Sequence, residues 1–283
     1  MDERITVRNG QETAKPSTPN DWTYGWRYED VKNADGTLQT QRIPLTPEEA
    51  LHPKEEYVMS ERTSHVMIAT ELRNMLRVWS VQHPEMTIFY NLIFGWDHPE
   101  IGDYAPDIAI VPNVREPEAD RGRFDVAAEG TRPCFVIEVV SPKTRSADKG
   151  VKLRDYARLG IAEYIYIDSR TTRRGIISEI VGHRLSQGVY QPIPIDEDGA
   201  VYCETLSLRI GILNGRVWVE DAITGRELLD HVETDRAYLA AEERATFAEE
   251  QVAAEREARL LAERRVAELD AQIKALMAER ASQ

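Results

Sequence analysis

The sequence predicts an α/β (α+β) fold: a mixed central sheet flanked by helices and followed by a long C-terminal helix. Two short runs rich in Val and Ile, at 105–111 and 134–140, are nearly all apolar and are typical of buried strands. A helical pattern and a third apolar run, at 161–168, come next, and this order predicts strands joined by a crossover helix. After Gly225 the chain has no Gly or Pro and is rich in Ala, Glu, Arg and Leu, which predicts the long helix.

Composition and charge narrow the class of protein. The chain has 283 residues and a formal net charge of −14, which argues against a protein that coats nucleic acid with its whole surface. The charge is uneven, because the segment 140–184 holds ten Lys and Arg against five Asp and Glu. Cys134 and Cys203 imply neither a disulfide framework nor a zinc site. Since the sequence shows no apolar leader and no run of about 18 apolar residues, we expect a soluble, cytoplasmic protein without a membrane partner.

Three parts are expected along the chain: an N-terminal arm at 1–50 that is partly disordered, a core at 51–225, and a helix at 226–283. Within the arm, the segment 21–41 is predicted to form a hairpin around the turn signal Asp35-Gly36. Its Trp and Tyr rings are expected to pack on the main domain rather than to stack on bases.

The first long helix of the core is predicted from Thr63 or Ser64 to Val81. Its apolar residues recur at helical spacing and define one buried face: Ile68, Leu72, Met75, Leu76 and Trp79. His65 falls on the same face, where a hydrogen-bonded core histidine is the more common role. A strand is expected at 87–96, and a long polar loop at 112–133.

A second helix is predicted from Asp148 to Leu159, with Gly160 ending it. Lys152 lies at the edge of its inward face, one turn from Tyr156, so its long side chain can deliver an ammonium group into a cleft. Lys143 and Lys149 are expected to point to solvent. Short strands with turn signals between them are predicted to form an antiparallel flank on the central sheet, at 175–185, 189–195, 200–203, 206–212 and 216–220.

The C-terminal helix carries a short apolar seam. Val266, Leu269, Ile273 and Leu276 follow the 3-4-3 spacing of a coiled coil, whereas upstream the seam weakens to Ala, Thr and charged residues. Two interpretations are open, a dimeric coiled coil and a solvated single helix.

Three residues carry the candidate chemistry. Asp107 stands at the start of one apolar strand and Glu138 inside another, where an ionised carboxylate is costly without a cation or hydrogen bonds. Two carboxylates at adjacent strand ends form the hard-oxygen site that Mg²⁺ prefers, and Lys152 can stabilise charge on a phosphodiester. The alternative is a structural ion pair between Glu138 and Lys152 or an arginine, with Asp107 only capping a turn.

An ordered series of short motifs resembles a known family. Pro106-Asp107, the run from Glu138 to Pro142, Thr144-Arg145, Asp148 with Lys152 and Tyr156, and the run from Glu163 to Asp168 look like the Uma-type restriction endonucleases, a branch of the PD-(D/E)XK nuclease superfamily. The resemblance covers about residues 44–227 and implies a restriction-endonuclease-like fold.

The resemblance also implies a set of site residues. Mg²⁺ or Mn²⁺ would be held by Asp107, Glu138 and the carbonyl of Val139, and Asp107, Glu138 and Lys152 would be catalytic. This sequence departs from the superfamily pattern at Val140, where a lysine is expected, and Lys152 would replace that lysine from the following helix. The Glu55-Glu56 region does not match the family's N-terminal acidic pattern, so no fourth ligand is assigned. Accessory roles are implied for three further residues, His65, Tyr156 and Asp168.

Two functions of different classes follow. The first is a metal-dependent DNA endonuclease that hydrolyses phosphodiester bonds, with Lys143, Arg145 and Lys149 contacting the DNA backbone. The second is a non-catalytic protein on a nuclease scaffold, which acts as an oligomerisation or interaction module through its C-terminal helix. In both cases we expect a homodimer that forms through the core and the C-terminal helix.

Overall fold

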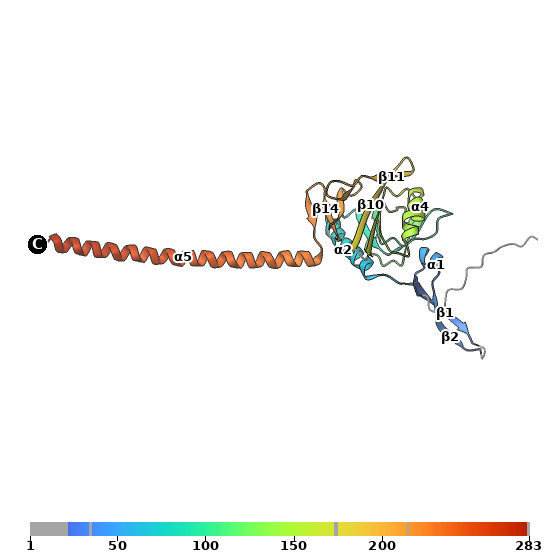
Figure 1. The fold of residues 1–283 in the computed structure, drawn as a ribbon, viewed down its shortest axis with the longest axis horizontal. Helices are drawn as coiled ribbons and strands as arrows, with labels where there is room; N and C mark the ends of the chain where they lie inside the picture. Colours follow the sequence, from blue (N-terminus) through green and yellow to red (C-terminus); the bar gives the residue numbers. More distant parts are fainter. Residues whose placement is uncertain (1–21, 34–35, 173–174, 214, 282–283) are drawn as a thin grey trace, which may run out of the picture. The chain divides into compact units, whose positions relative to one another are not determined.

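A six-stranded sheet forms the centre of the molecule (Figure 1). The structure is a computed structural model that describes residues 22–33, 36–172, 175–213 and 215–281. Two units, Met1–Leu228 and Leu229–Gln283, divide the chain. The strands of the central sheet, in spatial order, are β11 (Val189–Ile193), β10 (Gly175–Ser186), β9 (Glu163–Thr172), β8 (Phe135–Val140), β6 (Ile108–Pro112) and β4 (Met86–Tyr90).

The direction of the strands makes this sheet mixed. Neighbouring strands are antiparallel except β8 and β9, which run parallel. Parallel neighbours need a crossover connection, and the π-helical turn η1 (Ala147–Val151) and helix α4 (Lys152–Arg158) provide it. The predicted mixed sheet with a crossover helix is therefore confirmed.

Alternate residues of β8 serve two apolar clusters, because successive side chains of a strand point to opposite faces. Phe135, Ile137 and Val139 belong to the cluster that also contains the buried face of α2 (Thr63–Ser80). Val136 and Val140 belong to the other cluster, which contains residues of α4. Figure 1 shows α2 and α4 on opposite sides of the sheet. Glu138 shares the face of Val136 and Val140, so it is directed toward α4.

Helix α2 confirms the prediction made from apolar spacing. It spans Thr63–Ser80, and its buried residues are the predicted five: Ile68, Leu72, Met75, Leu76 and Trp79. The N-cap residue, Arg62, precedes the helix and makes no capping hydrogen bond through its side chain.

Two predictions in the middle of the core need correction. The strand expected at 87–96 is two strands, β4 and β5 (Ile93–Gly95), because Asn91 adopts a left-handed backbone with φ of 49° and breaks the extended run. The loop expected at 112–133 contains β7 (Arg123–Asp125), which pairs in parallel with β5, and the short helix α3 (Val126–Glu129). Asp125 caps α3 by accepting a hydrogen bond from the amide of Ala128.

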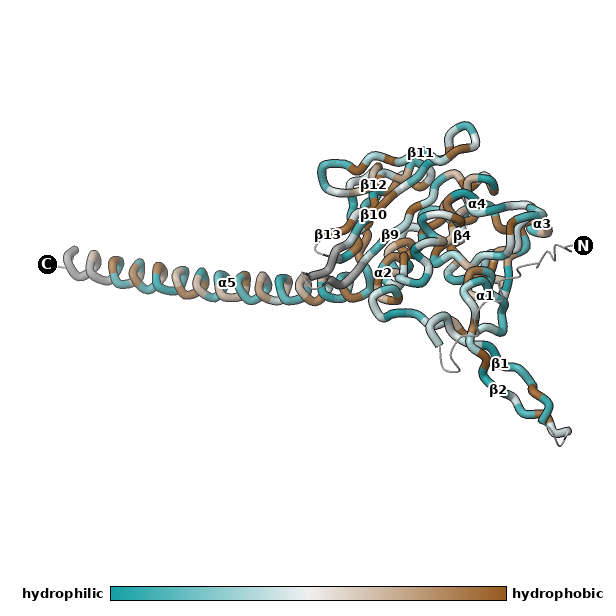
Figure 2. The backbone as a smooth tube through the Cα atoms, turned by 45° about the vertical axis from the view of Figure 1, so that its right-hand side comes forward, coloured by the Kyte–Doolittle hydropathy of each residue, from teal (hydrophilic) through white to brown (hydrophobic). Residues whose placement is uncertain are grey.

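The N-terminal arm forms the predicted hairpin (Figure 2). Strand β1 (Gly25–Lys32) pairs with β2 (Leu38–Pro44) and also with the two-residue strand β3 (Val58–Met59), and the short helix α1 (Pro47–Leu51) follows β2. The predicted turn residue Asp35 lies outside the described residues, as do residues 1–21. Tyr28 remains 54% exposed and lies beside the guanidinium of Arg42 from the paired strand, so the expectation that this ring packs on the main domain is wrong.

The strands after β11 form a separate antiparallel sheet, with the order β12 (Ala200–Cys203), β13 (Leu208–Leu213), β14 (Arg216–Asp221) and β15 (Arg226–Leu228). The predicted flank is thus split, since β10 and β11 extend the central sheet. Residues 226–228 were expected to be helical but form β15, because Leu228 is buried in the core opposite Val219.

The C-terminal unit is one helix, α5 (His231–Ala281). It begins at a reciprocal cap, in which the amide of Glu233 donates to Asp230 and the amide of Asp230 donates to Glu233. The side chain of Leu276, one of the predicted seam residues, lies outside the described residues. No helix in the described ranges is both long and apolar enough to cross a membrane.

Candidate active site

Glu138 is the buried centre of the site. It is 3% exposed on β8, and its Oε1 accepts hydrogen bonds from Lys152 Nζ at 2.8 Å and from the hydroxyl of Tyr156 at 2.8 Å. Lys152 and Tyr156 are one turn apart on α4, so both side chains leave the helix on the same side. The sequence placed Lys152 at the edge of the inward face, and the structure puts its ammonium against Glu138.

Asp107 stands beside Glu138 at the end of the neighbouring strand. The antiparallel register pairs Ile108 of β6 with Ile137 of β8, so Asp107, one residue before, lies opposite Glu138. Asp107 Oδ2 accepts a 2.6 Å hydrogen bond from the amide of Val139, which ties the carboxylate to β8. The two predicted carboxylates therefore belong to facing residues of neighbouring strands.

His65 reaches the same carboxylate from helix α2. Its Nε2 lies 3.1 Å from Asp107 Oδ2, and its Nδ1 lies 3.9 Å from Glu61. Burial would lower the pKa of His65, but the hydrogen bond and the charge of Asp107 outweigh burial, and the pKa is raised. The imidazole thus holds Asp107 in place.

Asp148 is a member of the site that the sequence analysis did not select. It is 1% exposed in η1, and its Oδ1 lies 3.0 Å from Lys152 Nζ. The spacing of four residues between Asp148 and Lys152 on a predicted helix was the available signal. Without the fold, however, nothing distinguished this pair from an exposed pair of the same spacing.

The charges of the site do not balance. Lys152 faces two buried carboxylates, Glu138 and Asp148, and Asp107 adds a third negative charge nearby. Burial raises the pKa of Glu138 to about 8; Lys152 opposes this shift, and Asp148 and Asp107 add to it. Burial would lower the pKa of Lys152, but the charges of Asp148 and Glu138 outweigh it, so the pKa is raised and the ammonium stays protonated. The pKa of Glu138 thus rises mainly through burial, and the pKa of Lys152 rises because two buried carboxylates face one ammonium.

The donor set is compatible with a divalent cation of the Mg²⁺ type. The hydrogen bonds to Asp107 and Glu138 use Oδ2 and Oε1, so each carboxylate keeps a second oxygen for a cation. Over the described part of the chain, no group of three or more His, Cys, Asp or Glu side chains could hold a metal ion. A site made of Asp107, Glu138 and the Val139 carbonyl would therefore leave its remaining positions to water, as Mg²⁺ sites commonly do.

Asp168 belongs to a different cluster. Its carboxylate is fully buried and lies 2.8 Å from Arg145 Nη2 and 2.8 Å from Lys149 Nζ, and Lys149 also pairs with Glu179 at 3.1 Å. The structure does not bring Asp168 to Glu138 or Lys152 by any described contact.

Two predicted solvent-facing lysines are held by the protein instead. The expectation for Lys149 is wrong because the buried Asp168 attracts its ammonium. The expectation for Lys143 is also wrong, because its ammonium donates a 2.6 Å hydrogen bond to the carbonyl of Ser60. Burial, aided by the charge of Arg62, lowers the pKa of Lys143.

Comparison with known proteins decides the family. The model of the Uma2 family, described as "Putative restriction endonuclease", matches residues 51–212, which is more than half of the chain. The chain belongs to the Uma2 family. A crystal structure of a protein described as a putative nuclease belonging to DUF820 from Anabaena variabilis is similar over 58% of this chain and 86% of that chain, with 15% identity and a TM-score of 0.40. No curated protein matches the chain.

The matched Uma2 region includes a cavity of about 230 Å³ that is lined by His65, the hydrogen-bond partner of Asp107. Arg62, Ser64 and His65 line it from the start of α2, and Val139, Ser141 and Arg145 line it from the end of β8 and the following turn. Two guanidinium groups and several hydroxyls thus surround a space next to Asp107 and its partner His65.

Proposed function

We propose that this Uma2-family protein is a metal-dependent endonuclease that hydrolyses phosphodiester bonds in DNA. The observation that carries the proposal is the register that sets Asp107 opposite Glu138 on neighbouring strands, with Lys152 Nζ 2.8 Å from Glu138. Two carboxylates on facing residues, together with one ammonium, match the requirements of phosphodiester hydrolysis.

Asp107, Glu138 and the Val139 carbonyl would hold Mg²⁺ or Mn²⁺. When bound, the cation would lower the pKa of a water molecule and neutralise charge that develops on the phosphate. The protein's own groups orient the ligands: the amide of Val139 and the ring of His65 hold Asp107, and the hydroxyl of Tyr156 holds Glu138. The excess of buried negative charge is the physical reason for a cation to bind here.

Lys152 acts as a fixed positive charge. Because its pKa is raised, it keeps its proton at neutral pH and can donate to an oxygen of the reacting phosphate as well as to Glu138. Arg62 in the neighbouring cavity would hold a second phosphate of the same strand, and Arg145, which lines the cavity while its Nη2 pairs with Asp168, would add a positive charge there. Lys143 and Lys149, which the sequence suggested for this role, are held by Ser60 and Asp168 and contribute mainly to the shape of the turn.

The test compares four proteins purified identically: wild type, Asp107→Asn, Glu138→Gln and the control Glu100→Gln. Glu100 lies on the surface in an ion pair with Arg158, so the control removes a carboxylate without touching the site. We expect wild type and Glu100→Gln to nick supercoiled DNA with Mg²⁺ or Mn²⁺ and to stop when the metal is chelated. Both site variants should lose cleavage.

A contaminating nuclease would cut equally in all four preparations. Equal cleavage in wild type and Glu138→Gln, with both metals and several forms of DNA, would contradict the endonuclease. The alternative of a non-catalytic scaffold that acts through its helix would then stand.

A further inference from the structure

Helix α5 has an unpartnered surface along its whole described length. Apart from the first residues, its side chains are exposed, including large apolar ones such as Tyr238 at 67%, Val252 at 65% and Val266 at 64%. No strand or helix of the same unit packs on it, since the unit Leu229–Gln283 contains only α5 among the described elements. Long isolated helices derive little stability from propensity alone, so a packing partner would supply what this helix lacks.

A single heptad frame runs through the helix, well beyond the short seam seen in the sequence. The a positions are Tyr238, Ala245, Val252, Arg259, Val266 and Ile273, and the d positions are Ala241, Ala248, Glu255, Ala262 and Leu269. Nine of these eleven residues are apolar. A strict seven-residue repeat drifts about 20° per heptad around a straight α-helix, so only a left-handed supercoil keeps it facing one partner.

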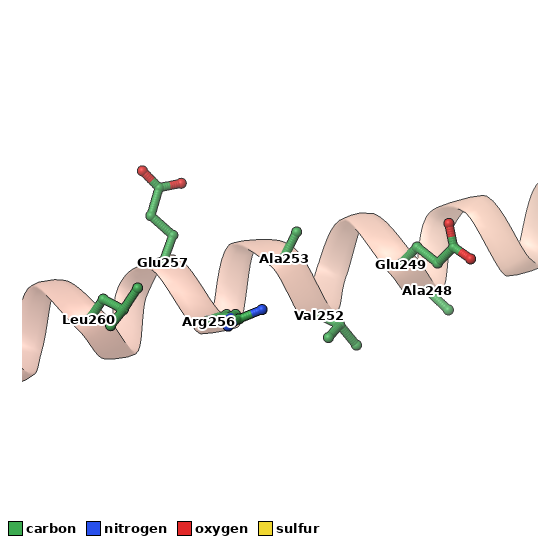
Figure 3. A pocket seen from close by; sticks show the side chains of 7 residues that line it. All are labelled: Ala248, Glu249, Val252, Ala253, Arg256, Glu257 and Leu260. Atoms are coloured by element: carbon green, nitrogen blue, oxygen red, sulfur yellow. The ribbon is translucent and has the colours of Figure 1, made fainter.

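The local surface is consistent with this frame. A shallow depression on α5 is lined by seven residues of this one helix, among them Ala248 and Val252. Figure 3 shows Ala248 and Val252 projecting from the same side of the helix, away from Glu257. One helix cannot enclose a ligand, but a second helix can cover such a surface.

The flanking charges select a parallel partner. In a parallel, in-register pair of identical helices, each g residue faces the e residue five positions later on the other copy. Arg244 then faces Glu249 and Arg265 faces Asp270, and the remaining g–e′ pairs contain no two like charges. Both charged pairs are therefore attractive.

The antiparallel alternative is repulsive when the tails overlap fully. In that arrangement e residues face e residues, which brings Glu242 to Asp270, Glu249 to Glu263, and Arg256 to Arg256 of the second copy. All three contacts join like charges. The g–g′ contacts of the same alignment join Arg244 to Gln272 and Gln251 to Arg265, so they add no attraction, and only the core contact of Glu255 with Arg259 joins opposite charges.

We propose that α5 binds a second copy of this chain as a parallel, in-register coiled-coil dimer. Glu255 at d and Arg259 at the next a form a polar layer that interrupts the apolar seam. In register, Glu255 faces Glu255 and Arg259 faces Arg259 of the other copy, and each Glu255 also reaches Arg259 of the other copy in the next layer, whereas a shift by one heptad leaves each charge against apolar residues. This layer therefore fixes the register at some cost in stability.

The arrangement has a consequence for the core. Because Leu228 ends the last strand of the core and α5 begins at His231, a parallel coil attaches both cores to the same end of the coil. An antiparallel coil would separate the two attachment points by roughly 75 Å, at about 1.5 Å per helical residue. For the proposed endonuclease, on which this consequence rests, two cores attached to one end of the coil could act on the same DNA duplex. The dimer itself does not depend on activity.

Orientation is tested in the full chain with Tyr238→Cys, an a position near the start of α5. Under mild oxidation this variant should form a disulfide-linked dimer, because equal a positions face each other only in the parallel, in-register pair. The matched control is Leu239→Cys, the adjacent b position, which should link poorly. Wild type reports any background from Cys134 and Cys203, which are partly or fully buried. In a mixture of the two variants, a disulfide between Tyr238→Cys and Leu276→Cys without any Tyr238→Cys homodimer would show an antiparallel coil and overturn the proposal.

The contribution of the g–e′ ion pairs to dimerisation is tested by analytical ultracentrifugation. The double variant Arg244→Glu with Arg265→Glu should dimerise about tenfold or more weakly than wild type, since all g–e′ ion pairs become repulsive. An equimolar mixture with Glu249→Arg plus Asp270→Arg should restore dimers. In an antiparallel coil the first double variant would not weaken, because Arg244 and Arg265 would face the uncharged residues Gln272 and Gln251.

The seam is tested by one pair of leucines. Leu269→Ala, at d, should weaken dimerisation about tenfold or more, whereas Leu260→Ala, at b and 52% exposed, should leave it within about twofold. A wild-type chain that remains monomeric at micromolar concentration would overturn the proposal. Loss of DNA cleavage without loss of the dimer would instead count against the proposed function alone.

Discussion

Lys152 Nζ lies 2.8 Å from Oε1 of Glu138, although the two residues lie on different elements, fourteen positions apart. The same ammonium lies 3.0 Å from Asp148, so one buried cation serves two buried carboxylates. This unequal charge count makes the effects of removing Lys152 and Glu138 different, which leads to the first two predictions.

Lys152→Met should destabilise the fold far more than Glu138→Gln. The lysine variant leaves Glu138 and Asp148 buried without their cation, which typically costs about 3–5 kcal/mol. Glu138→Gln leaves Lys152 paired with Asp148 and should change the free energy of unfolding by about 1 kcal/mol or less, in either direction. Urea unfolding of the metal-free proteins measures both values. A Lys152→Met variant as stable as wild type would show that the carboxylates are already neutral.

The rate of DNA cleavage should also depend on Lys152. If the endonuclease is active, Lys152→Ala should slow turnover by about 10²-fold or more, the usual scale for the loss of a positioned charge. Metal affinity, measured by calorimetry, should be largely retained because Asp107 and Glu138 remain. A variant with full activity would remove Lys152 from the reaction.

The stability of the chelated protein should depend on pH through Glu138. Its pKa is about 8 in the folded state and near 4.5 when unfolded, so between these values the folded state binds more protons. The stabilising contribution is therefore fully present below about pH 4.5 and is lost as the pH rises through 8. Unfolding curves at several pH values should show a smaller decline for Glu138→Gln than for wild type. Equal declines would assign the titration to another group.

Asp168→Asn should destabilise the turn that follows β8. The fully buried carboxylate accepts from Arg145 and pairs with Lys149, and losing hydrogen bonds to charged groups costs about 1.5–3 kcal/mol. Glu179→Gln is the matched control, because Glu179 also pairs with Lys149 but is 46% exposed, and it should change stability by about 0.5 kcal/mol or less. Thermal unfolding followed by circular dichroism compares the two. Equal losses of stability in the two variants would mean that the burial of Asp168 does not strengthen its ion pairs.

A chain shortened after Asp230 should keep the fold of the core, because α5 starts at His231. Ending the chain at Asp221, the last residue of β14, removes β15 and the buried Leu228, whose burial is worth about 1.5–3 kcal/mol. The shorter chain should therefore unfold at a lower temperature. If both unfold together, β15 does not stabilise the core.

Local sequence patterns predicted much of the fold. The apolar spacing of Ile68, Leu72 and Trp79 predicted α2 to within one residue at each end, and the Val- and Ile-rich runs predicted β6 and β8. Such patterns are properties of consecutive residues, so they can be read without knowing the fold. At Asn91 a single left-handed backbone angle separates β4 from β5. The sequence pattern does not show this angle, so it predicted one strand in place of two.

The site shows the same division. A carboxylate inside an apolar strand stands out because its burial is costly. The sequence by itself therefore determined the choice of Asp107 and Glu138 as candidates and the edge position of Lys152 on its helix. Only the tertiary structure decided that Asp148 shares Lys152, that His65 holds Asp107, and that Asp168 captures Arg145 and Lys149. Ion pairs and hydrogen bonds act over about 3 Å between residues tens of positions apart. Which charge meets which is therefore set by the packing of strands and helices, and sequence spacing carries no record of it.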